Sequence, residues 1–347
     1  MATLIHDKTD LQNMNLDLAG DYELANDIDA SGAPFTPLGT FTGTLDGKGF
    51  NINDLIITVI GVGTEYGAFI NTNQGTIKNL GLVDCVISVT ATISNALAGS
   101  LVFYNDVTGI INNCHCSGTL TVIGTTDCSS AGGLAFSNDG QIDDSYSLVI
   151  TSITAPNAHA GGFIVENIGT INNSYARGNT TVIGAASYAA GFIDHNYAGG
   201  VITNSYSTGI PSATNKGGFC RVNDDTITAC FWDITTSGVL TSDGGTGKTT
   251  AQMKNKFTFT NAGWDMGTSI VTHNGGYPYL GWEYGETPTW RLYKAAYVPV
   301  PSPRDEHPVE DKVTLEAIRN VEMSGMGRFH VDEEGNARYE SRFARNP

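Results

Sequence analysis

Short apolar runs separated by Gly and Asn fill residues 1–290, and within 66–235 they recur in the same order about every 30 residues. The first run ends in Asn, as in GGFIVEN (161–167), and the second reads Gly-x-Ile-x-Asn, as in GTINNSYA (169–176). The third is rich in Val, Ile and Thr, as in NTTVIG (179–184). β-Branched residues bounded by turn residues predict three short strands per copy. No apolar period of 3.6 residues persists in this region, so we expect no sizeable helix there.

Six imperfect copies of the unit fall within residues 66–235. A repeat near 30 residues with three strand-like runs is typical of one coil of a parallel β-helix. The first run ends in the same residue in every copy: Asn73, Asn105, Asn138, Asn167, Asn196 and Asn223. Because stacked Asn amides hydrogen-bond from coil to coil, and Asn tolerates left-handed turns, we expect a ladder at this column.

An apolar column follows the Asn column, and we predict it to be core: Ile77, Ile111, Ile142, Ile171, Ile202 and Ile227. The six cysteines are too few to form a disulfide framework for 347 residues. Cys114-His115-Cys116 suggests a metal site, but no second CxxC or His pair completes a ligand set. These residues also fall in columns occupied by Ser and Tyr in other copies. We therefore expect reduced structural cysteines, no metal site and no cofactor.

The unit and its flanks resemble the GLUG-type repeat of β-helical bacterial surface adhesins and some viral appendage proteins. PLGTFTGTLDGKGFNINDL (37–55) is similar to the coils that precede such repeats, and GGYPYLGWE (275–283) to their C-terminal closure. The resemblance covers roughly residues 15–283. It implies an all-β, right-handed parallel β-helix with an adhesive or structural role, extracellular or on a virion. It implies no catalytic set.

Composition changes sharply near residue 295. The predicted organisation is N-terminal coils at 1–65, the six-copy solenoid at 66–235, a closure at 236–295, a Pro-rich linker at 296–312 and a helix–hairpin segment at 313–347. This last segment makes a small α+β extension. GRFHVDEEGNARYESRFAR weakly resembles an element of bacteriophage tail-tip and baseplate proteins, and an ordinary accessory domain is the alternative.

The chain holds 42 glycines and has a formal net charge of −17. This acidity argues against binding nucleic acid or an anionic membrane, since both need clustered Lys and Arg. We expect no membrane insertion, because no stretch approaches the roughly 20 apolar residues of a spanning helix. The first residues lack a basic n-region and an apolar h-region, so we expect no classical secretion signal. GGTGKTT (244–250) is no P-loop, since Ser242 stands where the first Gly is needed.

Candidate chemistry is sparse. Parallel β-helices host glycan hydrolases, which need two carboxyl groups about 5–9.5 Å apart. The acidic candidates are Asp143 with Asp144, Asp224 with Asp225, and Glu166 with Asp194. Glu166 and His195 occupy equivalent positions in successive copies, so we expect them one coil apart as a weak ligand-binding candidate. The further candidates are Tyr146, Tyr175 and Tyr206, a stacked strip that either binds sugars or, as we favour, stabilises the solenoid face. Ca²⁺ binding stays open.

These observations favour a non-enzymatic structural or adhesion protein. The leading hypothesis is a bacteriophage appendage, located on the virion, that displays a rigid β-helix towards the host surface. The alternatives are a β-helical glycan depolymerase and a bacterial cell-surface adhesin. The expected partners are other virion proteins, bound through residues 297–347, a host surface glycan, and further copies of the same chain in a homo-oligomer.

Overall fold

The computed structural model describes residues 2–125, 127–269, 273–287 and 289–293, together with two strands near the C-terminus. The chain divides into two compact units, Met1–Lys294 and Ala295–Pro347. In the second unit β37 (Gly327–Val331) and β38 (Ala337–Ser341) pair antiparallel, which confirms the predicted hairpin. The predicted linker at 296–312 and the helix within 313–347 lie outside the described residues.

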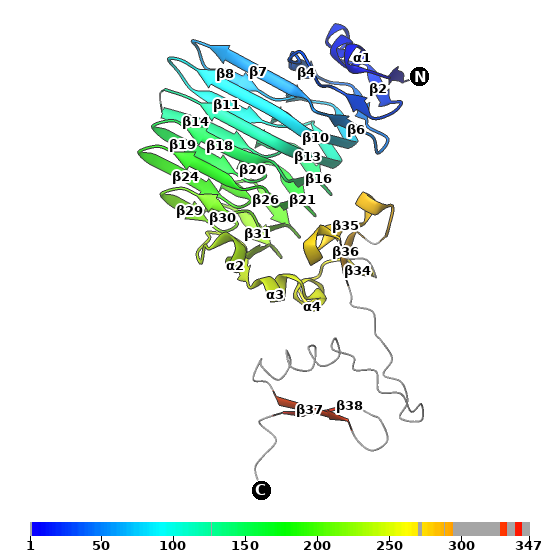
Figure 1. The fold of residues 1–347 in the computed structure, drawn as a ribbon, viewed down its shortest axis with the longest axis vertical. Coiled ribbons are helices and arrows are strands. Elements are labelled where there is room, and N and C mark those ends of the chain that lie inside the picture. Colours follow the sequence, from blue (N-terminus) through cyan, green and yellow to red (C-terminus); the bar gives the residue numbers. More distant parts are fainter. Residues whose placement is uncertain are drawn as a thin grey trace. The chain divides into compact units, whose positions relative to one another are not determined.

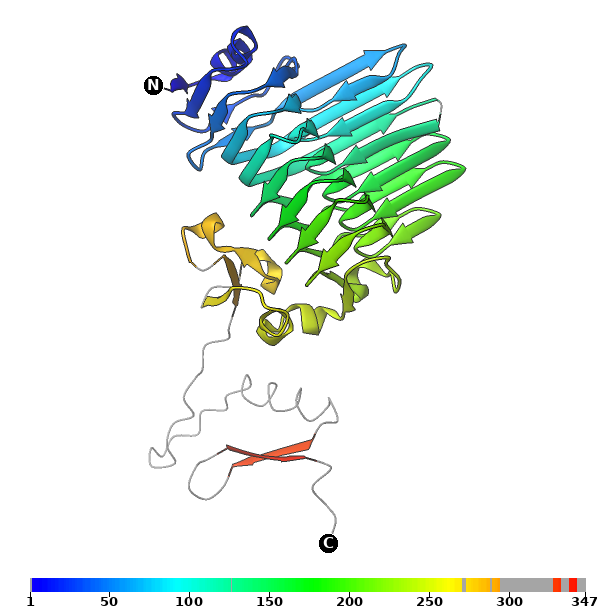
Figure 2. The same ribbon diagram turned by 180° about the vertical axis from the view of Figure 1, so that it is seen from behind.

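Three stacks of parallel strands build the first unit (Figures 1 and 2). Sheet C consists of β8 (Glu65–Gly67), β11 (Ala96–Gly99), β14 (Asp127–Gly132), β19 (Asn157–Gly161), β24 (Ala186–Ala190) and β29 (Asn215–Gly217). Sheet B consists of β4 (Leu38–Phe41), β9 (Ile70–Asn73), β12 (Val102–Asn105), β15 (Ala135–Asn138), β20 (Ile164–Asn167), β25 (Ile193–Asn196) and β30 (Cys220–Asn223).

Sheet A is the largest, with 20 strands. Its N-terminal part holds β1 (Thr3–Ile5), β2 (Asp21–Leu24), β3 (Ile28–Asp29), β5 (Thr44–Asp46), β6 (Asn51–Asn53), β7 (Ile56–Gly61), β10 (Thr76–Ala91) and β13 (Ile110–Ile123). The later coils supply β16 (Gln141–Asp143), β17 (Tyr146–Ser147), β18 (Ile150–Thr154), β21 (Thr170–Asn172), β22 (Tyr175–Ala176), β23 (Thr180–Ile183), β26 (Val201–Thr203), β27 (Tyr206–Ser207), β28 (Pro211–Ser212), β31 (Thr226–Thr228), β32 (Phe231–Asp233) and β33 (Thr246–Lys248).

The predicted all-β parallel β-helix is confirmed. Each repeat contributes one strand to sheet C, one to sheet B and two or three segments to sheet A, and equivalent residues pair in register. Ile142, for example, is paired with Ile111 on one side and Ile171 on the other. Because every strand bonds to the coils before and after it, the repeat period directly sets the stacking.

The Asn column forms the predicted ladder. The Asn138 amide donates to Asn167 Oδ1 at 2.8 Å and accepts from Asn105 Nδ2 at 2.7 Å. The same bond continues from Asn73 to Asn223, and the members from Asn73 to Asn196 are fully buried. Each buried amide thus hydrogen-bonds to the amide of the next coil in place of the water that it cannot reach.

The left-handed turns lie at a different column from the ladder. Positive φ angles near 50° occur at the Asn position of the Gly-x-Ile-x-Asn run, two residues after the core Ile: Asn79, Asn113, Asp144, Asn173, Asn204 and Ala229. This confirms that Asp144 merely replaces Asn, and it moves the expected left-handed role one column along the chain. A short polar side chain tolerates this conformation, which otherwise favours glycine.

The interior is a continuous apolar core. Five of the six predicted Ile residues are fully buried, and Ile227 at the C-terminal end is partly buried. Phe163, Phe192 and Phe219 stack in the same core with ring centroids 4.6–4.7 Å apart. The cysteines are free thiols, of which only Cys128 is exposed. Burial raises the pKa of the Cys114 thiol to about 12, so it stays protonated and unreactive.

Short helices close both ends of the solenoid. At the N-terminal end, α1 (Lys8–Asn13) begins at the capping residue Asp7 and continues into η1 (Met14–Leu16). After the last coil come α2 (Ile234–Ser237), α3 (Thr250–Met253), α4 (Lys256–Thr260), β34 (Met266–Ser269), η2 (Asn274–Gly276), β35 (Tyr279–Leu280), η3 (Gly281–Tyr284) and β36 (Trp290–Tyr293). Among the described residues, no helix has the length and apolar character needed to cross a bilayer.

Replacing one ladder amide should destabilise the solenoid. Asn138→Ala leaves a buried donor and a buried acceptor without partners, so we expect the free energy of unfolding in denaturant to fall by about 2–5 kcal/mol. Asn13→Ala is the control, because Asn13 is exposed and its side chain caps nothing. Equal stability of the two variants would contradict a structural role for the ladder.

Candidate functional site

Outward-facing side chains of sheets C and B meet along one flank of the solenoid. His159 projects from β19, and Asp194 and Arg221 project from β25 and β30. His159 Nδ1 lies 2.9 Å from Asp194 Oδ2, although 35 residues separate them in sequence. We refer to His159, Glu166, Asp194, His195 and Arg221 as the flank cluster.

Asp194 is the most buried member of the flank cluster, with 2% of its surface exposed. The Arg221 guanidinium donates to it through Nε and through Nη2, the latter at 2.8 Å. Burial opposes the charge of Asp194, but the hydrogen bonds from Arg221 and His159 outweigh burial and lower its pKa. Asp194 is therefore a fixed carboxylate that orients its neighbours rather than an accessible base.

Glu166 and His195 lie one coil apart, as predicted, since they are paired in register between β20 and β25. Burial raises the pKa of Glu166, and it outweighs the effect of His195, which lowers that pKa. The negative charges of Asp194 and Asp139 raise the pKa, against a further lowering effect of His159. His195 Nε2 contacts Asp224 Oδ2 at 2.7 Å, and its ring stacks on Tyr197 at 3.6 Å. Glu166 is thus a half-buried carboxyl group whose pKa is raised mainly by burial.

The same flank is aromatic towards the N-terminal coils. Phe103 and Phe136 stack with centroids 4.8 Å apart, and Tyr66 from sheet C packs on Phe103 at 4.7 Å. Towards the C-terminal coils, Tyr188 stacks on His159, and Arg221 lies over its ring. The flank therefore runs from apolar aromatic rings to hydrogen-bonding groups along the axis.

A recess lies beside this flank, where sheet B turns into sheet A. The turn after the ladder Asn has four residues at 106–109 and at 197–200, but only two at 139–140 and 168–169. The two longer turns stand about three coils, or roughly 14 Å, apart. They border a depression of about 460 Å³ over the two shorter turns, which we call the turn recess.

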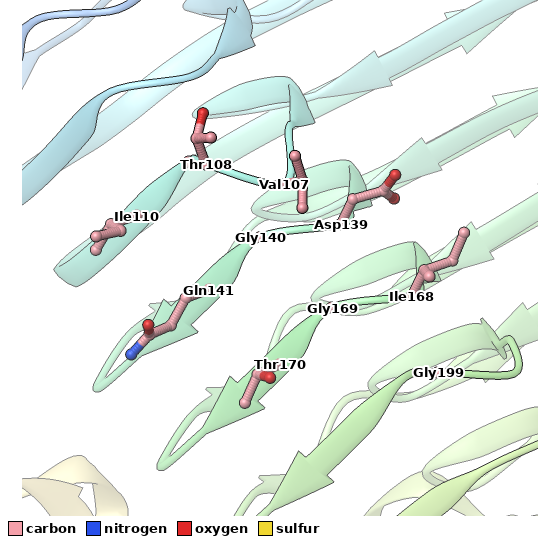
Figure 3. Close-up of a pocket in the computed structure, with 11 residues that line it drawn as sticks. Val107, Thr108, Ile110, Asp139, Gly140, Gln141, Ile168, Gly169, Thr170 and Gly199 are labelled. Carbon is pink, nitrogen blue, oxygen red and sulfur yellow. The ribbon is translucent and has the colours of Figure 1, made fainter.

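Figure 3 shows these turns on successive coils, with Val107 and Thr108 on one side, Asp139, Gly140 and Gln141 next to them, and Ile168, Gly169 and Thr170 beyond. The glycines are required here. A Cβ on Gly169 would lie 2.1 Å from the Gly140 carbonyl oxygen, and one on Gly140 would lie 2.3 Å from the Gly109 oxygen. Backbone therefore forms the floor of the recess, and side chains stand only at its edges.

The turn recess and the flank cluster adjoin each other. Asp139, which lines the recess, accepts a hydrogen bond from Tyr104 of β12 at 2.5 Å. Tyr197, in the second long turn, stacks on His195. Together they form one surface with aromatic, aliphatic, carboxyl and imidazole groups. Such a mixture suits a polar ligand with apolar faces, as sugars have.

His159, Arg221, Asp139 and Tyr197 were not singled out from the sequence. A signal for the recess was present, because the ladder Asn and the core Ile are six residues apart in two copies and four in the others. No repeated pattern marks the contact between His159 and Asp194, since these residues occupy unrelated columns of two different sheets.

The three candidate tyrosines lie beneath the closure. Tyr146, Tyr175 and Tyr206 stack with centroids 4.6 and 5.1 Å apart, and Tyr175 and Tyr206 are at most 1% exposed. Aromatic and aliphatic residues of the closure cover them: Met253, Phe259, Trp264, Met266, Tyr277, Leu280, Trp282, Trp290 and Leu292. They therefore have the packing role that we favoured, and offer no strip to a sugar.

The other acidic pairs diverge. Asp224 contacts His195, whereas the Asp225 carboxylate accepts from the Gly199 backbone at 2.7 Å. Asp143 contacts Asn172, and Asp144 occupies the left-handed turn. Cys114 and Cys116 are both in the core, whereas His115 stacks on Tyr146 outside it, so the three side chains do not converge on one ion.

Within the described residues, no group of three His, Cys, Asp or Glu side chains is arranged to hold a metal ion. In the same part of the chain, no Ser, Thr or Cys side chain hydrogen-bonds to the ring of His159 or His195. Neither of these two histidines is therefore placed to activate a hydroxyl or thiol nucleophile in the described arrangement.

No protein-family model and no curated protein matches the chain. Among solved structures, a putative immunoglobulin A1 protease from Bacteroides ovatus aligns with a TM-score of 0.53 at 21% identity, covering 81% of this chain and 92% of that one. Another, an IgA1 protease, has a TM-score of 0.41 and 18% identity and covers 70% of this chain. This chain spans 19% of the latter protein, and that score is too low to support a shared fold.

The comparison corrects one expectation. We predicted a non-enzymatic protein, and this is contradicted because a solved structure of similar fold is named as a protease. At 21% identity the likeness establishes the solenoid fold alone. The β-helix fold therefore does not support our expectation of a protein without enzymatic activity.

The closure should loosen as pH rises, because Glu283 is buried against the tyrosine stack. It accepts from the Tyr175 hydroxyl at 3.2 Å, and burial raises its pKa from 4.5 to about 7. The folded closure therefore binds an extra proton between these values, so the contribution of Glu283 to its stability is full below pH 4.5 and is lost as pH rises to about 7. Tryptophan fluorescence during thermal unfolding, at a series of pH values, measures this slope.

Glu283→Gln keeps the acceptor and removes the charge, so we expect the variant to lose that slope and to exceed the wild type in stability above pH 7. Glu23→Gln, at the N-terminal end, is the matched control. If Glu283→Gln showed the same dependence of thermal stability on pH as the wild type, groups other than Glu283 would be its cause.

Proposed function

We propose that this protein is a surface-displayed β-helix, of the virion-appendage or cell-surface type, that binds an extended glycan across the turn recess and the flank cluster. The observation that carries the proposal is the recess, which is bordered by two long turns and continuous with a row of aromatic and ionisable side chains. The surrounding charge of −17 favours a neutral glycan over an acidic one.

The chemistry of the surface supports a carbohydrate. Sugar rings present apolar C–H faces and polar hydroxyl edges. Val107 and Ile168, with exposed fractions of 72% and 46%, supply apolar contacts at the recess, and Asp139, Gln141 and Thr170 supply polar ones. A rigid row of stacked coils also matches the repeat of a polymer, since ordering a preformed surface costs little entropy on binding.

The display role remains part of the proposal. A solenoid of in-register coils is a stiff spacer, and residues 297–347, which include the β37–β38 hairpin, are the segment proposed to attach it to other virion proteins. The neighbour's name suggests a different activity, proteolysis, for which no residue of this chain is assigned a role here.

Shortening one long turn tests the binding surface. Deleting Val107 and Thr108 leaves Asp106-Gly109, the same dipeptide as the short turn Asp139-Gly140, so the coils should stack as before. We expect the variant to lose binding by at least about fivefold, the loss of more than about 1 kcal/mol, on an array of host-surface glycans.

Tyr197→Ala should weaken binding to a similar degree by removing the ring at the opposite long turn. Phe257→Ala is the matched control, because Phe257 is 71% exposed on the closure, away from the recess. Unchanged glycan binding by the deletion variant, with its fold intact by circular dichroism, would rule out the recess as the binding surface.

A second candidate function, glycan hydrolysis, is favoured by the paired carboxyl groups. Burial raises the pKa of Glu166, and the charge of the half-buried Asp139 makes a smaller contribution in the same direction. In such a reaction Glu166 would protonate the leaving glycosidic oxygen, while Asp139 takes a proton from the water that attacks the sugar carbon. Asp194, held by Arg221, would act only as a positioning group.

Glu166→Gln should then abolish cleavage while preserving binding. We expect the release of reducing ends to fall by at least about 100-fold, the usual contribution of a general acid, with little change in glycan affinity. Glu23→Gln serves again as the control. Reducing ends released equally by the wild type and Glu166→Gln would remove Glu166 from the mechanism, and no release by the wild type would leave binding alone.

A further inference from the structure

We propose that the outer face of the third strand run of sheet A, carried by β7, β10, β13, β18, β23 and β28, is a homotypic interface that pairs two copies of this chain. This surface, which we call the uncharged face, is distinct from the turn recess and the flank cluster, so the inference does not depend on the proposed function.

Register aligns the outward side chains of this run into three columns. Ser88 pairs with Thr58 on one side and Thr121 on the other, and the column continues through Ser152 and Thr181 to Ser212. A column of Ile and Thr lies on one side of these hydroxyls: Ile60, Thr90, Ile123, Thr154 and Ile183. On the other side the column reads Ile56, Val86, Thr119 and Ile150.

The uncharged face is exposed and apolar in a chain that is otherwise acidic. Ile60, Ile150 and Ile183 are 69%, 54% and 59% exposed. Residues 56–62, 86–93, 119–125, 150–156, 179–185 and 210–214, which form the strands and the turns that follow them, contain no Asp, Glu, Lys, Arg or His. Two copies with a net charge of −17 each repel least when they meet at a face without charge.

The hydroxyl column has free hydrogen-bonding capacity. Within the described residues, no side-chain hydrogen bond involves the hydroxyls of Thr58, Ser88, Thr121, Ser152, Thr181 or Ser212. Hydroxyls both donate and accept, so a column of them is self-complementary across a two-fold axis. The flanking Ile and Thr side chains would interdigitate as they do between packed sheets, with about 10 Å between backbones.

The size of the face also fits a second copy. Six strands of about five residues cover roughly 29 Å along the axis and about 17 Å along the strands, a footprint of about 490 Å² before the turns are added. Two such footprints approach the roughly 1,000 Å² at which specific interfaces begin. We therefore expect a reversible dimer whose population depends on concentration.

Analytical ultracentrifugation of the full chain over a wide concentration range tests the proposal. We expect the wild type to sediment as a monomer–dimer equilibrium. Thr121→Glu and Ser152→Glu place like charges opposite each other in the centre of the interface, and each should raise the dimer dissociation constant at least about tenfold. Thr241→Glu, an equivalent change at an exposed residue of the closure, should leave it unchanged.

Circular dichroism and thermal unfolding of each variant confirm that the solenoid remains folded, since both substituted positions face outward. A monomer at all concentrations would overturn the proposal, as would a dimer unaffected by Thr121→Glu and Ser152→Glu.

Discussion

Coil-to-coil hydrogen bonding is the interaction on which the rest of the structure depends. Each strand bonds to the equivalent strand of the preceding and following coils, and the buried Asn ladder from Asn73 to Asn223 adds side-chain bonds at the same spacing. A shift of register would break the backbone pairing, the ladder and the core stacks together. Identical residues therefore recur because each side chain packs on, or hydrogen-bonds to, the same residue type in the next coil. This explains both the Ile core and the stacked Phe163, Phe192 and Phe219.

Function on such a scaffold must come from departures from the repeat. The columns that hold the core are uniform, whereas the flank holds Val165, Asp194 and Arg221 at one column of successive coils. The uniform columns supply rigidity, and the variable column lies outside the core, where a substitution does not disturb the stacking of the Ile and Phe residues, although Val165 and Asp194 are themselves buried. The flank cluster and the turn recess both lie at such variable positions.

Much of the fold was predictable from the sequence, because a column of identical residues indicates its own environment. Asn138, Ile142 and Cys114 could each be placed by the residues above and below them. The pairing of Glu166 with His195 followed from the same logic. The contact between His159 and Asp194 could not be predicted, because it joins sheets C and B. The repeat does not reveal the angle between these two sheets. The covering of Tyr175 by Trp290 was equally hidden, because the closure occurs once and has no column to compare with.

The dimensions of the recess follow from two additional residues in each of two turns, at 106–109 and 197–200. Because each coil bonds only to its neighbours, such an insertion protrudes without altering the ladder. The width of the recess is thus adjustable in steps of one coil, about 4.8 Å, by moving an insertion from one repeat to the next. During evolution, insertion or deletion of a dipeptide in one turn could adapt the recess to a ligand of different size without changing the hydrophobic core. The same changes could be introduced by protein engineering.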